Sequence, residues 1–433
     1  MNTPLRDSTT VQPTLASIDQ NRHPVRVFLD SADYSVLSDE KRCTLKLDEL
    51  REKLIQWSDS GDVEFWYSGT ILSEMAPLES RYADASVART DLLVRLCKTQ
   101  ALISIDRILQ QELQNLGAGT PETASMAVYS YSGNWFPELT DIMSPVSWLE
   151  SIRDLDITAK QHGLNRDARR KLQKQLFKNR QPTNAMRELL SRQEIALAEI
   201  LQMYPMREQD ALVLGNYVVG KATAAQAEEA FFASLRDPSW MIRWFHNHAD
   251  KLSPVTDWVR GSADNMLKMI QQVSGDVEAL KAKSKELRET GAALGIAPLV
   301  PAIDSAWWLS QQDKIVVVLA KQLAAQLYEI SLESHTPADV DRLAPSLATC
   351  IRVFHSSTWN SAGTAARQPK KSDWADSLHA MYAPYVDIFR TDSYMAPIVE
   401  EKVKKYGTTV VAKIGNLVEQ IEIRLNSQRT IQK

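Results

Sequence analysis

The sequence of 433 residues predicts an α/β fold. In this fold both ends of the chain build one parallel sheet with its flanking helices, and a large all-α insertion lies between the two halves. Three observations lead to this prediction. Short apolar runs alternate with helical patterns near the N-terminus, the same alternation returns near the C-terminus, and the long segment between them has helical apolar spacing. Alternation of strands with helices is typical of βαβ units, whose strands run parallel.

The first part of the α/β domain spans residues 24–116. Three short apolar runs rich in β-branched or aromatic side chains predict buried strands at residues 25–29, 63–67 and 101–105. Between the first two runs, residues 45–57 carry apolar side chains at helical spacing. A further helix begins directly after the second strand and contains Glu74.

The middle part, residues 117–364, is predicted to be an almost wholly helical insertion. Its apolar side chains recur at helical spacing, and prolines separate the helices. The clearest helical stretches are residues 185–203, 222–235, 264–294 and 315–331. No strand alternation is evident there.

The last part, residues 365–433, returns to α/β character and completes the domain. Helices are predicted at residues 372–382 and 394–406, and strands at residues 386–390 and 408–411. The simplest topology joins this part to residues 24–116 in one sheet.

Composition and charge narrow the function classes. Because 50 basic residues face 54 acidic ones, the net charge is -4, and a strongly basic nucleic-acid coat is excluded. Three distant cysteines exclude a disulfide framework and fit a reducing compartment. No segment is long and apolar enough for a membrane span, and residues 1–23 lack the apolar core of a signal peptide. We therefore expect a cytoplasmic protein with a disordered arm at 1–23 and no membrane contact.

Acidic residues follow the predicted strands at three places. Asp30 ends the first strand, Glu74 lies just after the second, and Asp392 follows the strand at 386–390. Because the carboxyl ends of parallel strands meet at one edge of a sheet, we expect these side chains to converge there. Asp373 and Asp376 lie three residues apart in a predicted helix and share a face, so one or both could join them.

Such a cluster indicates a metal site. Crowded carboxylates raise one another's pKa values, and a divalent cation removes that penalty. Mg²⁺ and Mn²⁺ favour oxygen ligands, and paired metals activate water for attack on a phosphodiester. Since a single acid at a strand end or helix start is more often a cap, the joint pattern carries the prediction.

Four segments resemble a known family, the PIN-like nuclease domain of the PIN-domain superfamily. They correspond to its opening strand and turn, its second acidic position, and its C-terminal helix and strand: residues 27–37, 68–74, 372–379 and 385–392, in that order. Each segment is short, and the specificity lies in their order and strand context. The family commonly has Asn two residues after the first acid, where this chain has Ala32.

The resemblance implies a three-layer PIN-like domain and a nuclease that depends on Mg²⁺ or Mn²⁺ and usually acts on RNA. It also implies that the catalytic and metal-binding acids are Asp30, Glu74, Asp376 and Asp392, with Asp373 competing with Asp376 for the third position. Thr391 would position a water molecule or a ligand through its hydroxyl group.

Substrate contacts are predicted at two places. Residues 165–192 are rich in Lys and Arg, and Arg170, Lys174 and Lys178 are spaced to share one helical face that could follow a phosphate backbone. A solvated helix face or a contact with a partner protein explains the same pattern. His379 lies three residues after Asp376 and could contact a phosphate at the edge of the site.

The predicted function is therefore metal-dependent hydrolysis of RNA or single-stranded nucleic acid. Two alternatives remain open, a non-catalytic interaction protein and a structure-specific DNA nuclease with the same metal chemistry. Because a free nuclease endangers its host, we also expect an inhibitory partner protein or restraint by the insertion itself.

Overall fold

The structure is a computed structural model, and it describes residues 23–39, 41, 44–76, 80–119, 128–137, 156–178, 181–185, 206–218, 220–247, 263–293, 297–299, 302–332, 334–361 and 371–431. The predicted disordered arm, apart from residue 23, and most of the predicted helix at 185–203 lie outside these residues.

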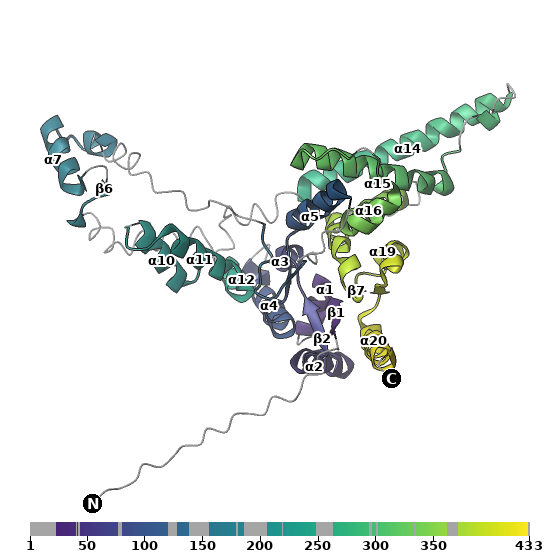
Figure 1. Cartoon of the computed structure of the whole chain (residues 1–433), viewed down its shortest axis with the longest axis horizontal. Helices are drawn as coiled ribbons and strands as arrows, with labels where there is room; N and C mark the ends of the chain where they lie inside the picture. The colour runs from purple at the N-terminus through teal and green to yellow at the C-terminus, as the bar shows by residue number, and fades with distance from the viewer. Residues whose placement is uncertain are drawn as a thin grey trace, which may run out of the picture.

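A four-stranded sheet, parallel throughout, lies at the centre of the molecule (Figure 1). Its strands, in spatial order, are β2 (Val63–Trp66), β1 (Val25–Phe28), β7 (Ile388–Arg390) and β8 (Thr409–Val411). Val27 pairs with Phe65 on one side and with Ile388 on the other. The strands predicted at 25–29, 63–67, 386–390 and 408–411 are thereby confirmed, and both ends of the chain contribute to one sheet.

Short strands extend this arrangement. β3 (Ala101–Leu102) continues the sheet beyond β2, because the amide of Tyr67 donates to Gln100 and its carbonyl accepts from Leu102. β3 also pairs antiparallel with β4 (Tyr129–Ser130). β4 lies in the middle part of the chain, as does an antiparallel pair formed by β5 (Phe177–Lys178) and β6 (Gln181–Pro182). The middle part therefore contains short strands that the sequence pattern did not predict. Two-residue strands are too short for alternation to be visible in a sequence.

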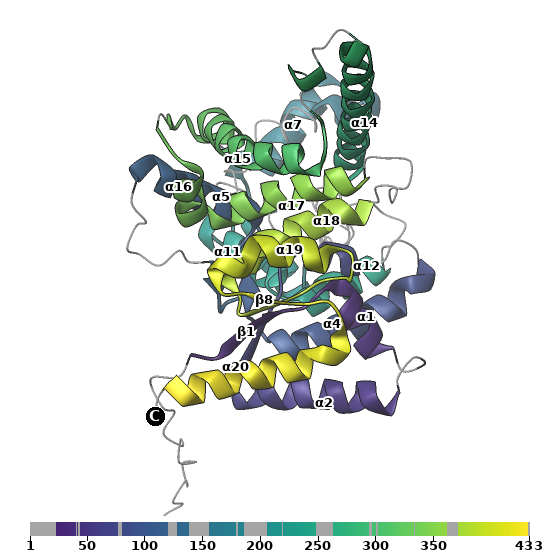
Figure 2. The same ribbon diagram turned by 90° about the vertical axis from the view of Figure 1, so that its right-hand side faces the viewer.

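Helices surround the sheet on both faces (Figure 2). The helices of the first part are α1 (Ser31–Ser38), α2 (Leu45–Ser60), α3 (Gly69–Met75), α4 (Ala83–Cys97) and α5 (Ile105–Ala118). Those of the last part are α18 (Lys371–His379), α19 (Met395–Val403) and α20 (Leu417–Ile431), with a 3₁₀ segment, η3 (Ala380–Tyr385), after α18. Figure 2 shows α2 and α20 together below the sheet and α19 with α18 above it.

The described helices of the middle part include α7 (Arg166–Leu176), α10 (Glu208–Val218), α11 (Ala224–Leu235), α12 (Pro238–Asn247), α14 (Ala263–Ala293), α15 (Ser305–Tyr328), α16 (Pro337–Leu343) and α17 (Pro345–Ser361). They confirm the helical stretches predicted at 222–235, 264–294 and 315–331. In the part of the chain that the structure describes, none of the helices has an apolar stretch that could cross a bilayer.

Two apolar cores hold these elements. The larger core fills the space around the sheet and includes Phe28, Phe65 and Phe389, each almost without exposure. The smaller core lies between α5, α15, α16 and α17, with Leu113 and Val316 fully buried. The first core positions the carboxyl edge of the sheet, and the second joins the middle helices to it.

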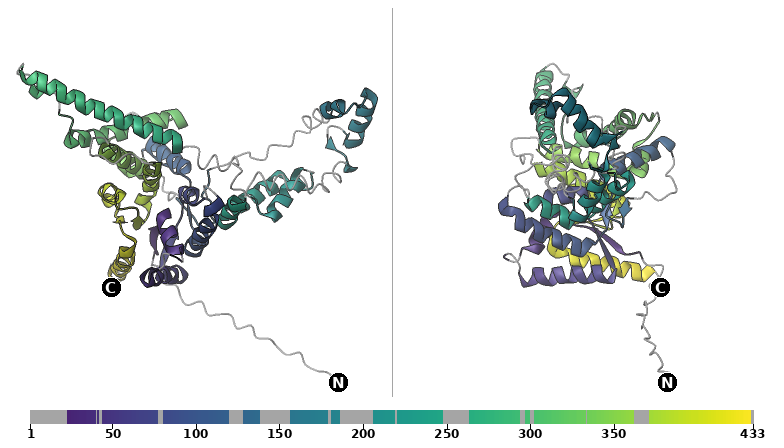
Figure 3. Two further views of the ribbon diagram at one scale, coloured as in Figure 1. Left: turned by 180° about the vertical axis from the view of Figure 1, so that it is seen from behind. Right: turned by 90° about the vertical axis from the view of Figure 1, so that its left-hand side faces the viewer.

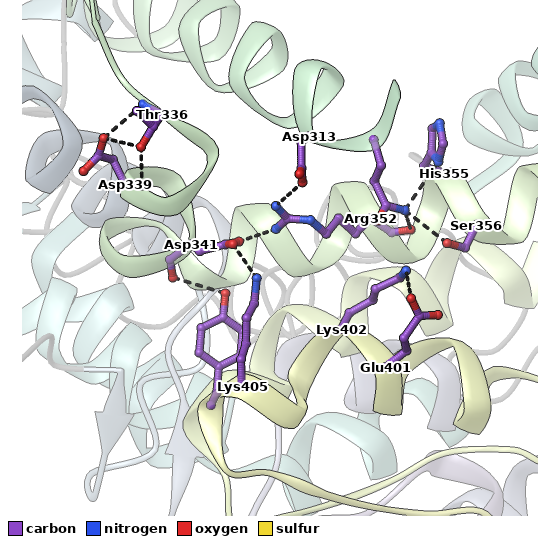
Figure 4. A network of polar contacts seen from close by, with 12 residues as sticks. Asp313, Thr336, Asp339, Asp341, Arg352, His355, Ser356, Glu401, Lys402 and Lys405 are labelled. Carbon is purple, nitrogen blue, oxygen red and sulfur yellow. Dashed lines mark hydrogen bonds and ion pairs between the residues drawn. The ribbon is translucent and has the colours of Figure 1, made fainter. Parts of the chain in front are cut away.

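A charged network joins four elements at the surface of the second core (Figure 4). Arg352 of α17, with 7% of its side chain exposed, lies 2.8 Å from Asp313 of α15 and also pairs with Asp341 of α16. Lys405, from the 3₁₀ turn η4 (Lys404–Tyr406), binds Asp341 at 2.6 Å. The network therefore ties the middle helices to the last part of the α/β domain.

Candidate metal centre

Three potential ligand side chains converge beside the sheet. One ligand atom each of Asp30, Glu74 and His379 lies within 4.8 Å of the other two, which is the spacing of groups that share one cation. Asp30 and His379 are buried and Glu74 is half-buried. Two carboxylate oxygens and one imidazole nitrogen thus lie together with little exposure to water.

The positions of Asp30 and Glu74 follow from the sheet topology. Asp30 comes two residues after the end of β1 and caps the start of α1. Glu74 lies on α3, which begins after β2 with Ser68 as its N-cap residue. Because β1 and β2 are neighbours and run parallel, both carboxylates lie at the same edge of the sheet.

His379 reaches this edge from the far end of the chain. It is the last residue of α18, and its ring packs against Phe28 of β1 with centroids 5.8 Å apart. Its Nε2 lies 3.9 Å from a carboxylate oxygen of Glu74 and is buried without a hydrogen-bond partner among the described residues. Since a buried imidazole nitrogen rarely lacks a partner, this atom fits the role of a cation ligand.

A buried ion pair supports Asp30. The carboxylate of Asp33 accepts a hydrogen bond from the amide of Asp30 at 3.2 Å and lies 3.0 Å from the guanidinium of Arg390, at the end of β7. Burial raises the pKa of Asp33 to about 7, the charge of Asp30 adds to this rise, and the charge of Arg390 opposes it. Through Asp33, β7 and α1 fix the backbone at Asp30.

Asp392 has a different environment. It follows β7 as predicted, but its carboxylate accepts hydrogen bonds from the amides of Tyr394 and Met395, at 2.9 and 2.7 Å. These amides open α19, so Asp392 caps that helix. Among the described residues it is not part of the three-residue group.

The other predicted residues are also placed. Asp376 is half-buried on α18, one turn before His379, and lies outside the three-residue group. The side chain of Asp373 lies outside the described residues. Thr391 is buried at 4% exposure next to Asp392.

The basic residues lie elsewhere. Arg170 and Lys174 are exposed on α7, which Figure 3 shows at the outer end of an arm, away from the sheet. The predicted helical face shared with Lys178 is wrong, because α7 ends at Leu176 and Lys178 lies in β5. At that point the backbone of Phe177 is extended and its side chain is buried.

Sequence reasoning missed two features of this centre. His379 was expected at its edge and lies within it, and the Asp33–Arg390 pair was not expected at all. The spacing of three residues between Asp376 and His379 indicated a shared helix face but not which of the two points inward. Comparison with family models, with curated proteins and with solved structures finds no match for this chain.

Proposed function

We propose that the chain is a divalent-metal-dependent nuclease with a PIN-like α/β domain, acting on RNA or single-stranded nucleic acid. The observation that carries the proposal is the convergence of Asp30, Glu74 and His379 at the carboxyl edge of a parallel sheet. The order of the PIN-like segments along the chain supports it. In this proposal residues 117–364 are an insertion in that domain.

The donor set fits a divalent cation. Two carboxylates within 4.8 Å of each other repel, and a cation between them offsets that repulsion. The imidazole of His379 narrows the choice of cation, because nitrogen ligands suit Mn²⁺ and other transition metals better than Mg²⁺. We therefore favour Mn²⁺ over Mg²⁺ as the ion held by Asp30, Glu74 and His379. A cation bound there would supply Lewis-acid polarisation of a phosphate oxygen and would lower the pKa of a water molecule.

The protein's own groups have separable roles in this proposal. Asp30 and Glu74 supply negative charge, and His379 presents Nε2 from a third element, so that three separate segments fix the geometry. Asp33 and Arg390 act through the backbone of Asp30 and are positioning residues. Asp376, one helical turn from His379, is the nearest additional carboxylate on α18 for a second cation or a water-bridged contact.

The test begins with Mn²⁺ binding to the full chain, measured by calorimetry and by electron paramagnetic resonance. We expect Asp30→Asn, Glu74→Gln and His379→Gln each to weaken Mn²⁺ binding about tenfold or more. Asp276→Asn, which removes an exposed carboxylate on α14, is the matched control and should bind Mn²⁺ as the wild type does.

Cleavage of labelled single-stranded RNA and DNA, with Mn²⁺, Mg²⁺ or EDTA, then tests the activity. We expect Mn²⁺-dependent cutting that Asp30→Asn abolishes. Unchanged Mn²⁺ binding in all three variants would refute the centre. Mn²⁺ binding at the centre without cleavage of any substrate would refute the nuclease and favour an interaction protein.

A further inference from the structure

A cavity of about 480 Å³ lies beside the candidate metal centre. Two of its lining residues, Ser73 and Leu378, directly precede Glu74 and His379 in the chain. α3 and α18 therefore present one residue to the cavity and the next to the metal centre. Its size is within the range of small-molecule sites and suits one nucleoside.

The walls of the cavity are mostly apolar. Trp135, Leu378 and Tyr382 contribute apolar surface, with Ile105 and Pro137 beside them. None of the described residues that line it is Lys, Arg or His. A phosphate group would lack a cation here, whereas a flat ring with apolar faces and polar edges fits these walls.

The polar side chains of the cavity include three hydroxyls and one carboxylate. Thr70 and Ser73 contribute from α3, and Ser104 and Asp106 from the start of α5. Ser104 is 8% exposed, and its hydroxyl has no hydrogen-bond partner among the described residues. A buried hydroxyl without a partner at the wall of a cavity is suited to bind a ligand.

Asp106 gives the cavity its only carboxylate among the described lining residues. The pKa of Tyr382 is raised by burial and, secondarily, by the charge of Asp106, so this carboxylate lies near the ring that forms the wall. Its backbone carbonyl accepts a hydrogen bond from the hydroxyl of Tyr328 at 3.4 Å. Since an ionised carboxylate only accepts hydrogen bonds, the group opposite it must donate them.

We propose that this cavity holds one nucleobase of the nucleic-acid substrate, with Asp106 accepting hydrogen bonds from its amino edge. Guanine fits best, because its ring N–H and its amino group are adjacent donors and match the two oxygens of one carboxylate. Uracil, which has no amino group, fits worst. The inference rests on the proposed function, since it makes the bound base the neighbour of the phosphodiester that would be cut.

Guanosine and inosine 5′-monophosphates provide a matched pair of probes, because inosine lacks only the amino group. Binding is measured by calorimetry on the full chain in EDTA, so that no metal contributes. We expect the guanosine nucleotide to bind the wild type about tenfold more tightly, as a hydrogen bond to a charged acceptor predicts. In Asp106→Asn the two affinities should become nearly equal, and in the control Asp276→Asn the tenfold difference should remain.

A second variant keeps the proposal testable if Asp106→Asn fails to fold. Ser73→Phe places a ring in the cavity and should abolish binding of both nucleotides, with folding checked by circular dichroism. Equal affinities in the wild type, no binding of either nucleotide, or an unchanged preference in Asp106→Asn would overturn the base site.

The two proposals fail separately. Preference for guanosine in a chain that binds no Mn²⁺ would support the base site and refute the metal centre. Mn²⁺ binding without that preference would do the reverse.

Discussion

Glu112 provides a sharp test of how this fold responds to pH. It lies on α5 with no exposure to solvent. Its carboxylate accepts hydrogen bonds from the amides of Ser346 and Leu347, at 2.8 and 3.0 Å, and from the hydroxyl of Tyr385 at 2.6 Å. Burial raises its pKa from 4.5 to about 7, and the hydrogen bonds work in the opposite direction.

The sign of the effect follows from this rise. Because the pKa is higher in the folded chain than in the unfolded chain, folding strengthens proton binding. The resulting stabilisation is fully present below about pH 4.5 and is lost as the pH rises through about 7. A rise from 4.5 to about 7, at about 1.4 kcal/mol per pH unit, corresponds to about 3 kcal/mol of unfolding free energy.

Glu112→Gln isolates this contribution, because glutamine resembles the protonated acid and does not ionise. We would measure urea unfolding of both chains at pH 5 and pH 8. The wild type should lose about 2.5 kcal/mol more than the variant over this interval, because pH 5 already lies above the unfolded pKa. Glu278→Gln, an exposed position on α14, should follow the wild type.

The opposite ranking would refute the reasoning. If Glu112→Gln is about 2 kcal/mol less stable than the wild type at pH 8, the ionised form with its three donors is the preferred one. The start of α17 would then be held by a charge and not by a neutral acid.

Three further predictions concern the sheet edge. Arg390→Met should lower the unfolding free energy in urea by about 3–5 kcal/mol, because it leaves Asp33 buried without its cation. It should also weaken Mn²⁺ binding about tenfold, whereas a purely structural pair would leave Mn²⁺ binding unchanged. Gly69→Ala should lower the unfolding free energy by about 1–3 kcal/mol, because its methyl group would lie 2.9 Å from the ring of Trp135, and a variant as stable as the wild type would contradict this packing. Asp392→Ala should cost about 1 kcal/mol through loss of the α19 cap and leave Mn²⁺ binding unchanged, so weakened binding would restore Asp392 as a ligand.

The central strands could be predicted because each is a short apolar run that stands out from its polar neighbours. Val25 to Phe28 and Val63 to Trp66 are nearly all buried, and only Arg26 and Glu64 are partly exposed. The acids after these strands could be predicted for the same reason, since the strand end is visible in the sequence. Pairing between β1 and β7 followed from the recurrence of the α/β pattern, which a local pattern alone does not fix.

The place of His379 could not be predicted, because it depends on how α18 ends. α18 ends at this residue, and the chain goes on as the 3₁₀ segment η3, which contains Pro384. At this helix end the ring of His379 packs against Phe28, and its Nε2 lies 3.9 Å from a carboxylate oxygen of Glu74. The Asp33–Arg390 pair likewise joins two distant segments, so no spacing rule reveals it.

Asp30 and Asp392 show why the same sequence position gives two different environments. Both follow a parallel strand and precede a helix, and both are typical cap residues. At Asp392 the carboxylate itself accepts the helix amides and is occupied. At Asp30 the carboxylate of Asp33 accepts a hydrogen bond from the backbone amide of Asp30, and Arg390 forms an ion pair with Asp33. Asp30 also forms a capping box with Asp33 at the start of α1, so capping does not separate the two acids. What separates them is that a carboxylate oxygen of Asp30 lies within 4.8 Å of ligand atoms of Glu74 and His379.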